Sequence, residues 1–236
     1  MPARLKWDQE GTREYQTGID HGVLYVWDST QNRYGKGVAW SGLTGVDESP
    51  EGAEPTDLWA DNIKYITLLS TETLKLTIKA YTYPEEFEEC DGSASIGVEG
   101  VTIGQQNRKR FAFSYRTVLG NDTEMNDYGE KLHIVYGCLA SPSERNYATI
   151  NDSPEGNEFS WEVSTTPTSD VPTGFKPTAS VEINSSTIEG GKTGAKYKKI
   201  CDALWGVDPD PTEQITGQDA EVLSPTEIYT LLTAQG

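Results

Sequence analysis

The sequence predicts a mainly β protein: an antiparallel β-sandwich or barrel with one flanking α-helix, a long inter-strand loop and extended termini. Alternating apolar and polar residues recur in short segments through most of the chain. Clusters of Gly, Pro, Asn and Asp separate these segments, and no repeat of solenoid or propeller length is present. At 236 residues the chain can bury a sizeable core, and β-sandwiches of this size often form one unit.

The clearest strand pair lies at 109–118 and 131–139. The first strand alternates Phe111, Phe113, Tyr115 and Thr117 with Arg110, Ala112, Ser114 and Arg116. The second alternates Leu132, Ile134 and Tyr136 with Lys131, His133 and Val135. Turn-forming residues at 120–129 separate the two. This pattern predicts a hairpin with a polar tip, one apolar face and one charged face, with His133 as a surface or interface residue on the polar face.

Further strands are expected at 22–27, 64–69, 73–83, 101–105, 158–165 and 178–184. A helix is expected at 195–205, where Tyr197, Ile200 and Leu204 share a stripe. A short final helix begins after Ser224, because a proline follows the cap and Glu227 lies three residues beyond it. These elements divide the chain into an N-terminal arm (1–21), a β-sandwich domain (22–206) and a C-terminal arm with a short helix (207–236).

Residues 28–62 form the expected long loop, because their periodicity is weak and acidic residues are frequent. Irregular loops beyond roughly 12–15 residues are usually functional or disordered. Trp40, Leu43, Leu58 and Trp59 argue against disorder, since such side chains favour burial. We therefore expect them to be buried against a neighbouring molecule.

Charge limits the possible partners, because 19 Lys and Arg oppose 37 Asp and Glu and give a formal net charge of −18. Proteins that grip a nucleic acid backbone have the opposite sign, so binding through the average surface is not expected. The three cysteines, Cys90, Cys138 and Cys201, fit buried free thiols in a reducing compartment. The chain shows no signal peptide and no apolar run of membrane-spanning length, so folding in a cytoplasm is expected, and the sequons at Asn121, Asn151 and Asn184 are read as chance matches.

No motif predicts an enzyme, a cofactor site or a metal site. The acidic residues at 85–91 could suggest a glycosidase carboxylate pair or a calcium site, but a solvated acidic loop fits such a charge run better. Residues 190–194 lack the first glycine of a phosphate-binding loop, since Ser186 occupies that position. His21 and His133 have no second ligand at metal-binding spacing.

Four long strings carry a family resemblance: GAEPTDLWADNIKYITL (52–68), AYTYPEEFEECDGS (80–93), IGQQNRKRFAFSYRTVLGNDTEMNDYGEKLHIVYGC (103–138) and INDSPEGNEFSWEVSTTP (150–167). They resemble major tail tube proteins of long-tailed, non-contractile bacteriophages. The likeness extends through the helix that ends in ALWG and covers roughly residues 18–206.

The resemblance implies a structural virion protein of the tail that is made in the host cytoplasm. Its subunits form hexameric rings whose inner strands join into a continuous barrel, and the rings stack into a tube that conducts the genome during ejection. The implied partners are other copies of the chain, a tape-measure protein inside the tube, and tail tip and terminator proteins at its ends. DNA passes without specific binding, no membrane is involved, and no catalytic residue is implied.

On this interpretation residues 28–62 are the candidate stacking arm. The expected assembly residues are Trp40, Leu43, Leu58, Trp59, Arg110, Arg116 and Lys131. The three bases must either pair with acids of a neighbouring subunit or lie away from the DNA. A carbohydrate-binding β-sandwich, such as a receptor-binding phage component, is the alternative, and it would need an exposed aromatic platform.

Overall fold

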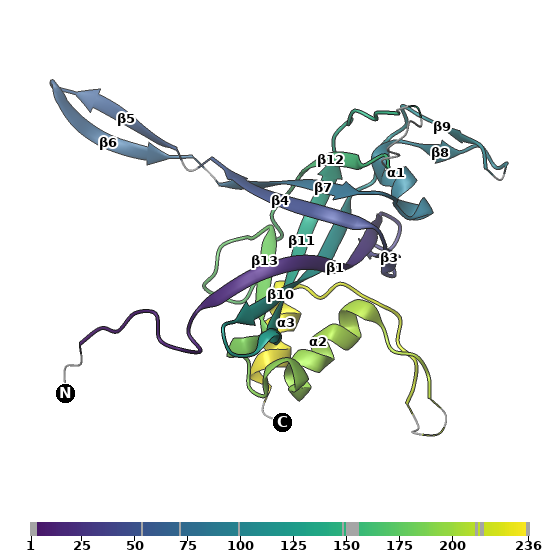
Figure 1. The fold of residues 1–236 in the computed structure, drawn as a ribbon. Coiled ribbons are helices and arrows are strands. Elements are labelled where there is room, and N and C mark those ends of the chain that lie inside the picture. Colours follow the sequence, from purple (N-terminus) through teal and green to yellow (C-terminus); the bar gives the residue numbers. More distant parts are fainter. Residues whose placement is uncertain are drawn as a thin grey trace.

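A computed structural model describes residues 4–234 apart from 53, 71, 99, 148, 150–155, 211, 213 and 214. Antiparallel strands dominate it, and two longer helices cover one side of the strands (Figure 1). Nine of the strands form one hydrogen-bonded sheet that folds into two layers, and β5-β6 and β8-β9 form two separate two-stranded sheets. The predicted fold class, a β-sandwich with a flanking helix, is therefore confirmed. The sequon at Asn151 lies outside the described residues.

The first layer has the strand order β1-β10-β11-β13, with every neighbouring pair antiparallel. These strands are Glu14–Asp28, Phe111–Asn121, Met125–Ala140 and Ser180–Asn184, respectively. Two short strands, β2 (Arg33–Tyr34) and β3 (Val38–Trp40), pair with the C-terminal half of β1. β1 begins well before the predicted residue 22, because Glu14–Thr17 continue the ladder along the end of β10. This early part is exposed, so it lacks the alternation that marks a half-buried strand.

Strand β11 passes from the first layer into the second at Gly137. Before it, Lys131–Val135 pair with β13, and after it Leu139 and Ala140 pair with β12 (Phe159–Ser164). Gly137 has φ +60°, and a Cβ there would lie 2.2 Å from the carbonyl oxygen of Thr166. Only glycine fits this bend. The second layer continues from β12 to β7 (Thr73–Ala80) and then to β4 (Leu43–Glu51).

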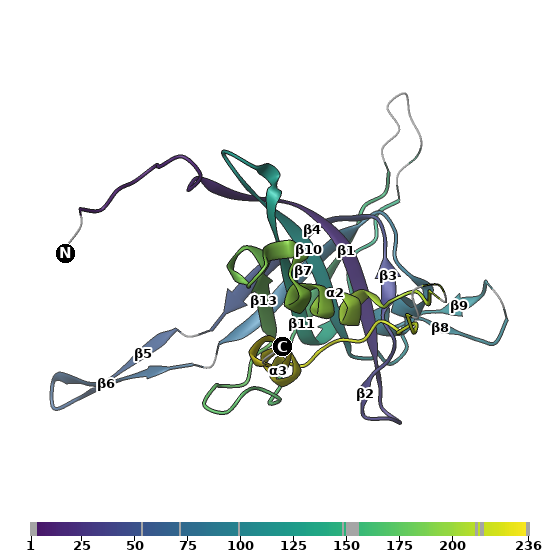
Figure 2. The same ribbon diagram turned by 90° about the horizontal axis from the view of Figure 1, so that it is seen from below.

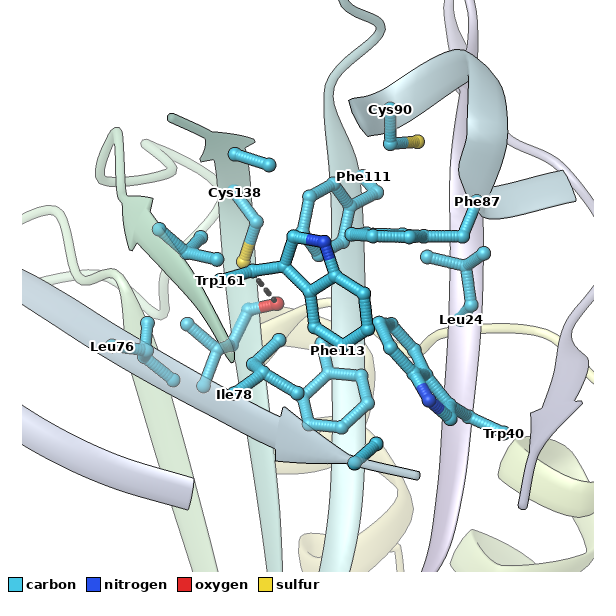
Figure 3. Packing of buried hydrophobic residues seen from close by; sticks show 14 of the residues in the cluster. Leu24, Trp40, Leu76, Ile78, Phe87, Cys90, Phe111, Phe113, Cys138 and Trp161 are labelled. Atoms are coloured by element: carbon cyan, nitrogen blue, oxygen red, sulfur yellow. Dashed lines mark hydrogen bonds between the residues drawn. The ribbon is translucent and has the colours of Figure 1, made fainter. Parts of the chain in front are cut away.

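An aromatic core fills the space between the two layers (Figure 3). Phe113 of β10, Trp161 of β12 and Phe87 surround Trp40, with ring centroids 4.5 to 5.5 Å from it. Such tilted and edge-to-face pairs contribute roughly 0.5–1.5 kcal/mol each beyond the area they bury. The free thiols of Cys90 and Cys138 are buried in this core, and Cys201 is buried as well, which confirms the prediction of buried free thiols.

A second core lies between the first layer and the helices α2 (Ala195–Trp205) and α3 (Pro225–Thr233). Figure 2 shows both helices lying across these strands. The strands contribute Ala112, Leu132, Ile134 and Tyr136, and the helices contribute Tyr197, Ile200, Cys201, Leu204 and Ile228. The predicted charged outer face of the hairpin is therefore wrong for most of its length. Phe113 lies opposite Val135, so Phe113 and Ile134 are on opposite faces of the first layer. The second layer covers the face with Phe113, and the two helices cover the face with Ile134.

The C-terminal residues belong to the body. Ser224 caps α3 through the predicted capping box with Glu227, and Pro225 is its first residue. Ile228 is buried in the second core, where Val222, Leu223 and Leu231 also pack. Tyr136 donates a hydrogen bond to the carbonyl oxygen of Leu223 at 2.7 Å, which holds the strap before the helix. The segment from Val222 onward thus completes the core.

The segment predicted as a long loop, 28–62, consists largely of strands, so that prediction is wrong. It contains β2, β3, β4 and β5 (Pro55–Ala60). β5 pairs with β6 (Ile63–Leu69), which confirms the predicted strand at 64–69. β4 leads into β5 and β6 leads into β7, so a two-stranded ribbon projects far from the body (Figure 1).

The remaining elements are short. The acidic segment forms η1 (Glu85–Phe87) and α1 (Glu88–Asp91) and is followed by a small hairpin, β8 (Ala94–Ser95) with β9 (Thr102–Ile103). The strand predicted at 101–105 is thus shorter than expected. η2 (Ser185–Thr187) and η3 (Gly191–Thr193) connect β13 to α2.

Candidate assembly surfaces

The four apolar residues expected at an assembly surface separate into two groups. Trp40 is 2% exposed, and its indole N–H donates to the carbonyl oxygen of Thr82 at 2.8 Å. It is a core residue, so its assignment to an interface is wrong. Leu43 begins β4 and packs partly buried against the same core. Leu58 and Trp59 are 44% and 69% exposed on the distal hairpin. Only these two remain available to a partner.

The distal hairpin, defined here as β5 and β6, has one apolar face. Cross-strand partners in an antiparallel pair share a face. The pairs Thr56–Leu68, Leu58–Ile66 and Ala60–Ile63 place five apolar side chains and one threonine together. The opposite face is mixed, because it carries Trp59 and Leu69 beside the ion pair of Asp57 with Lys64, at 2.7 Å. Every residue of β5, and every residue of β6 except Thr67, is exposed.

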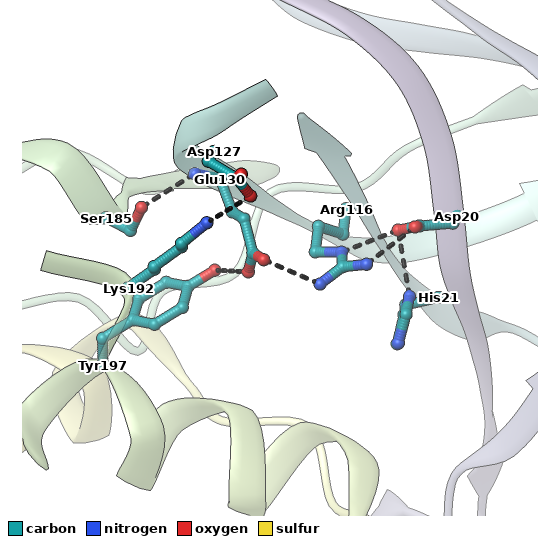
Figure 4. A network of polar contacts seen from close by, with 8 residues as sticks. All are labelled: Asp20, His21, Arg116, Asp127, Glu130, Ser185, Lys192 and Tyr197. Atoms are coloured by element: carbon teal, nitrogen blue, oxygen red, sulfur yellow. Dashed lines mark hydrogen bonds and ion pairs between the residues drawn. The ribbon is translucent and has the colours of Figure 1, made fainter. Parts of the chain in front are cut away.

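Arg116 has both of its carboxylate partners within its own chain (Figure 4). Its Nε and Nη2 each donate to the carboxylate of Asp20 at 2.7 Å, and Nη1 donates to Glu130 at 2.9 Å. Glu130 also accepts from the hydroxyl of Tyr197 at 3.1 Å. The hydrogen bonds from Arg116 lower the pKa of Asp20, and the pKa of Arg116 is raised in return.

The other expected bases differ in their surroundings. The ammonium of Lys131 pairs with Glu182 of the neighbouring strand at 3.0 Å. Arg110 is exposed at the residue before β10. On the second layer, Lys75 and Lys79 pair across the strands with Glu51 and Asp47, both at 2.8 Å. Arg116 and Lys131 therefore have carboxylate partners within their own chain and need no acid from a neighbouring subunit.

His133 is 6% exposed, so the prediction of a surface histidine is wrong. Its ring stacks on Tyr115, and its Nε2 lies 3.1 Å from the hydroxyl of Thr117 and 3.3 Å from the amide nitrogen of Gln16. Its buried Nδ1 has no hydrogen-bond partner among the described residues. Burial lowers the pKa of His133. Strand alternation assigns His133 to the polar face, so its burial could not be predicted from local patterns.

The first layer ends in two strands whose outer edges are open over much of their length. In the described residues, β13 pairs only with β11. β1 is covered by β3 at Gly22–Leu24 and by β2 at Trp27 and Asp28, whereas Glu14–Asp20 pair only with β10. Open edges of this kind can accept a strand from another chain. Their positions follow from pairing over long sequence distances, which local patterns do not reveal.

The acidic segment at 85–91 is partly neutralised by nearby bases. Glu89 pairs with Lys109 at 2.5 Å, and Asp91 pairs with Arg145. Arg145 in turn lies over the ring of Tyr83 at 5.6 Å. These contacts tie α1 to the start of β10 and to the loop after β11, which is a structural role.

No helix in the described part of the chain is long and apolar enough to cross a membrane. No protein-family model matches the sequence, and a search of curated proteins finds no match. The surfaces that remain are an open-edged antiparallel layer and a projecting hairpin with an exposed apolar face, and both are suited to contacts between protein chains.

Proposed function

We propose that this chain is a structural virion protein, the tail tube subunit of a long-tailed, non-contractile bacteriophage, whose stacked hexameric rings conduct the genome during ejection. The observation that carries this proposal is the pair of open edges at opposite ends of the first layer. The sequence resemblance supports it independently and supplies the number of six copies per ring.

The strand directions favour ring closure. β1 is antiparallel to β10, β10 to β11, and β11 to β13, so β1 and β13 run in opposite directions. When copies are related by rotation about one axis, β13 of one copy meets Glu14–Asp20 of the next in antiparallel orientation. This contact uses a different surface on each copy, and such heterologous contacts form a ring when the rotation between copies closes.

Stacking of rings would use the distal hairpin. Its exposed apolar face has no cover in one copy, and apolar patches that remain exposed mark contact sites. The proposed stacking arm is therefore 55–69 rather than 28–62, because Trp40 and most of β4 belong to the body.

Charge supports a passage for DNA. The chain carries a formal net charge of −18, and Arg116, Lys131, Lys75 and Lys79 are already paired with carboxylates. Because acidic residues outnumber basic ones by 18, release of counterions from a duplex would be weak, so DNA would slide without specific binding. The role needs no catalysis and no cofactor. Its partners would be further copies, a tape-measure protein, and the tail tip and terminator proteins, within the virion tail after assembly in the host cytoplasm.

Electron microscopy of the purified protein over a concentration series tests this proposal. We expect tubes or rings with six-fold symmetry and a central hole. A protein that stays monomeric at high concentration and binds a glycan would overturn it in favour of the carbohydrate-binding alternative.

A further inference from the structure

A cavity of about 540 Å³ opens beside the second core. The end of β1, the strand β2 and Tyr136 of β11 line one part of it, and the strap before α3 and the first turn of α3 line another. Small-molecule sites usually have volumes of roughly 300–1,000 Å³, so the cavity is large enough for a ligand. None of its lining residues belongs to the open edges of the first layer or to the distal hairpin. Assembly through those surfaces leaves the cavity without a role.

Two aromatic rings form an apolar wall of this cavity. The rings of Trp27 and Tyr34 pack edge to face, with centroids 4.9 Å apart. The hydroxyl of Tyr34 accepts a hydrogen bond from the backbone N–H of Gly137 at 3.0 Å, which fixes the ring against the body. Trp27 belongs to neither core, and its indole N–H has no hydrogen-bond partner among the described residues. The wall therefore offers aromatic surface together with an unused donor.

Polar side chains of the lining supply both donors and acceptors. The guanidinium of Arg33 has no carboxylate partner in the part of the chain that the structure describes. Asp170 lines the cavity from the loop after β12, and the hydroxyls of Thr226 and Ser224 lower its pKa, so its carboxylate is an ionised acceptor. Glu221 is exposed, and no described residue pairs with its side chain. These groups are therefore available to a ligand.

A ligand that matches this lining has an apolar face and groups that both donate and accept hydrogen bonds. Hydroxyl groups do both, and a pyranose ring carries them around its edge while its faces carry C–H groups. We propose that the cavity binds one saccharide unit, with Trp27 against its C–H face and Asp170, Glu221 and Arg33 hydrogen-bonded to its hydroxyls. An organic cation also suits aromatic surface beside carboxylates, but Arg33 would repel it. The inference goes beyond the proposed function, because tube assembly needs no such site.

Saturation-transfer NMR with the full chain tests the site, because it observes the ligand and tolerates a large assembly. The probes are methyl glucoside, methyl galactoside and N-acetylglucosamine, and choline serves as the cationic comparison. We expect at least one of the saccharides to bind with a dissociation constant on the order of 1 mM, because a ligand this small has few atoms to contribute. Choline should give no signal at the same concentration.

Two variants place the bound saccharide in this cavity. Trp27→Leu keeps an apolar side chain but removes the aromatic surface, so it should weaken binding at least about tenfold. Glu221→Ala removes one acceptor and should weaken binding about three- to tenfold. Neither residue belongs to a core, so the unfolding midpoint and tube formation should stay close to those of the unmodified protein. Trp59→Leu is the matched control, because Trp59 is an exposed tryptophan outside the cavity, and it should bind normally.

The outcomes separate this inference from the proposed function. If none of the saccharides binds at about 50 mM, well above the expected dissociation constant, the site is wrong and the tube proposal stands. Equal binding by Trp27→Leu and the unmodified protein would also overturn the site, as would binding of choline in place of the saccharides. If the unmodified protein binds a saccharide but forms neither rings nor tubes, the proposed function fails and the site stands.

Discussion

Tyr115 and His133 lie directly opposite each other on β10 and β11, with ring centroids 4.6 Å apart and planes only 2° from parallel. The hydroxyl of Tyr115 donates to Glu48 of β4 at 2.8 Å, so the stacked pair joins the two layers. On its other side, Nδ1 of His133 lies 3.9 Å from the carboxylate of Glu182, near Lys131. A titratable ring is thus buried where the aromatic core meets polar residues.

This burial predicts a pH dependence of stability. The pKa of His133 is lowered from its ordinary value of 6.5, chiefly by desolvation, although Glu182 and Glu48 oppose that shift. The unfolded chain therefore binds the proton more tightly than the folded chain. The contribution is fully present above the unfolded pKa and is lost as pH falls through the folded pKa. The free energy of unfolding should therefore decrease toward acid.

The variant His133→Gln isolates the contribution of His133 to the pH dependence of the free energy of unfolding. Urea unfolding between about pH 7.5 and about pH 5 should show a shallower decrease for the variant than for the unmodified protein. The difference between the two proteins at about pH 7.5 reports the loss of the stacking on Tyr115 and of the Nε2 contacts, since the imidazole is then neutral in both states. Equal slopes for the two proteins would contradict the assignment.

Arg116 should be a stability residue and not a contact for another subunit. Its side chain is 17% exposed and bridges Asp20 with Glu130. Arg116→Leu leaves two carboxylates without their cation and should cost about 2 kcal/mol, less than a fully buried pair because Asp20 is partly exposed. Arg116→Lys keeps the charge but cannot donate to both carboxylates in the same geometry, so its loss should be smaller. Urea denaturation measures both. Unchanged stability together with lost assembly would instead favour an interface role.

Trp40 and Trp59 both lie in the segment predicted as a loop, but they should contribute differently to the free energy of unfolding. Trp40→Ala removes a buried aromatic from the first core and should cost about 3–5 kcal/mol. Trp59→Ala changes an exposed residue of the distal hairpin and should alter the free energy of unfolding by less than about 0.5 kcal/mol. Trp59 lies on the face opposite Leu58 and Ile66, so the variant should still form tubes, as judged by sedimentation. The prediction fails if the two variants have equal stability.

Gly137 should tolerate no side chain. Gly137→Ala combines a left-handed φ of +60° with a Cβ placed 2.2 Å from the carbonyl oxygen of Thr166, so β11 must shift where it changes layers. We expect a loss well beyond the roughly 1–2 kcal/mol of a left-handed residue alone. Gly97→Ala is the matched control, because its φ is +83° and no atom lies within 4 Å of its Cβ position. Thermal unfolding of both variants separates the clash from the backbone cost.

The sequence predicts well those elements that have one buried face or a cap. The strands around Phe113, the helix at 195–205 and the capping box at Ser224 were all expected and are present. Each depends on neighbouring residues, because alternation, helical stripes and caps are local patterns. The fold class follows from these elements.

The predictions from the sequence are incomplete or wrong where the structure depends on contacts between residues that are distant in the chain. Arg116 meets Asp20 across 96 residues, so its charge could be predicted but not its partner. The strand alternation could not show that Phe113 lies opposite Val135, because the register is set by an irregularity at the turn end of the hairpin, between Leu119 and Asn121. The distal hairpin was missed in part because every residue of β5 is exposed, so this strand lacks the alternation of a half-buried strand. Trp40 and Trp59 look equivalent in the sequence, and only the path of β3 into the core distinguishes them.

Removing the distal hairpin should separate folding from stacking. Residues 52–72 can be replaced by Asn-Gly, because Glu51 and Thr73 are paired and a two-residue turn of this type joins antiparallel strands. No residue of β5 or β6 belongs to either core, so the unfolding midpoint should stay near that of the unmodified protein. Tubes should be absent in electron micrographs, while single rings can still form through the open edges of β1 and β13.

A milder variant guards against an effect of the shortened backbone. Leu58→Ser with Ile66→Ser keeps both strands and changes only the apolar face, so it should also abolish stacking. Thr67→Ser, on the opposite face, should leave stacking intact. Deleting the whole of 28–62 would be uninformative, because it removes Trp40 and β4 and should unfold the chain. If tubes of normal length form without the distal hairpin, then the hairpin is not the stacking arm and ring-to-ring contacts must come from another surface.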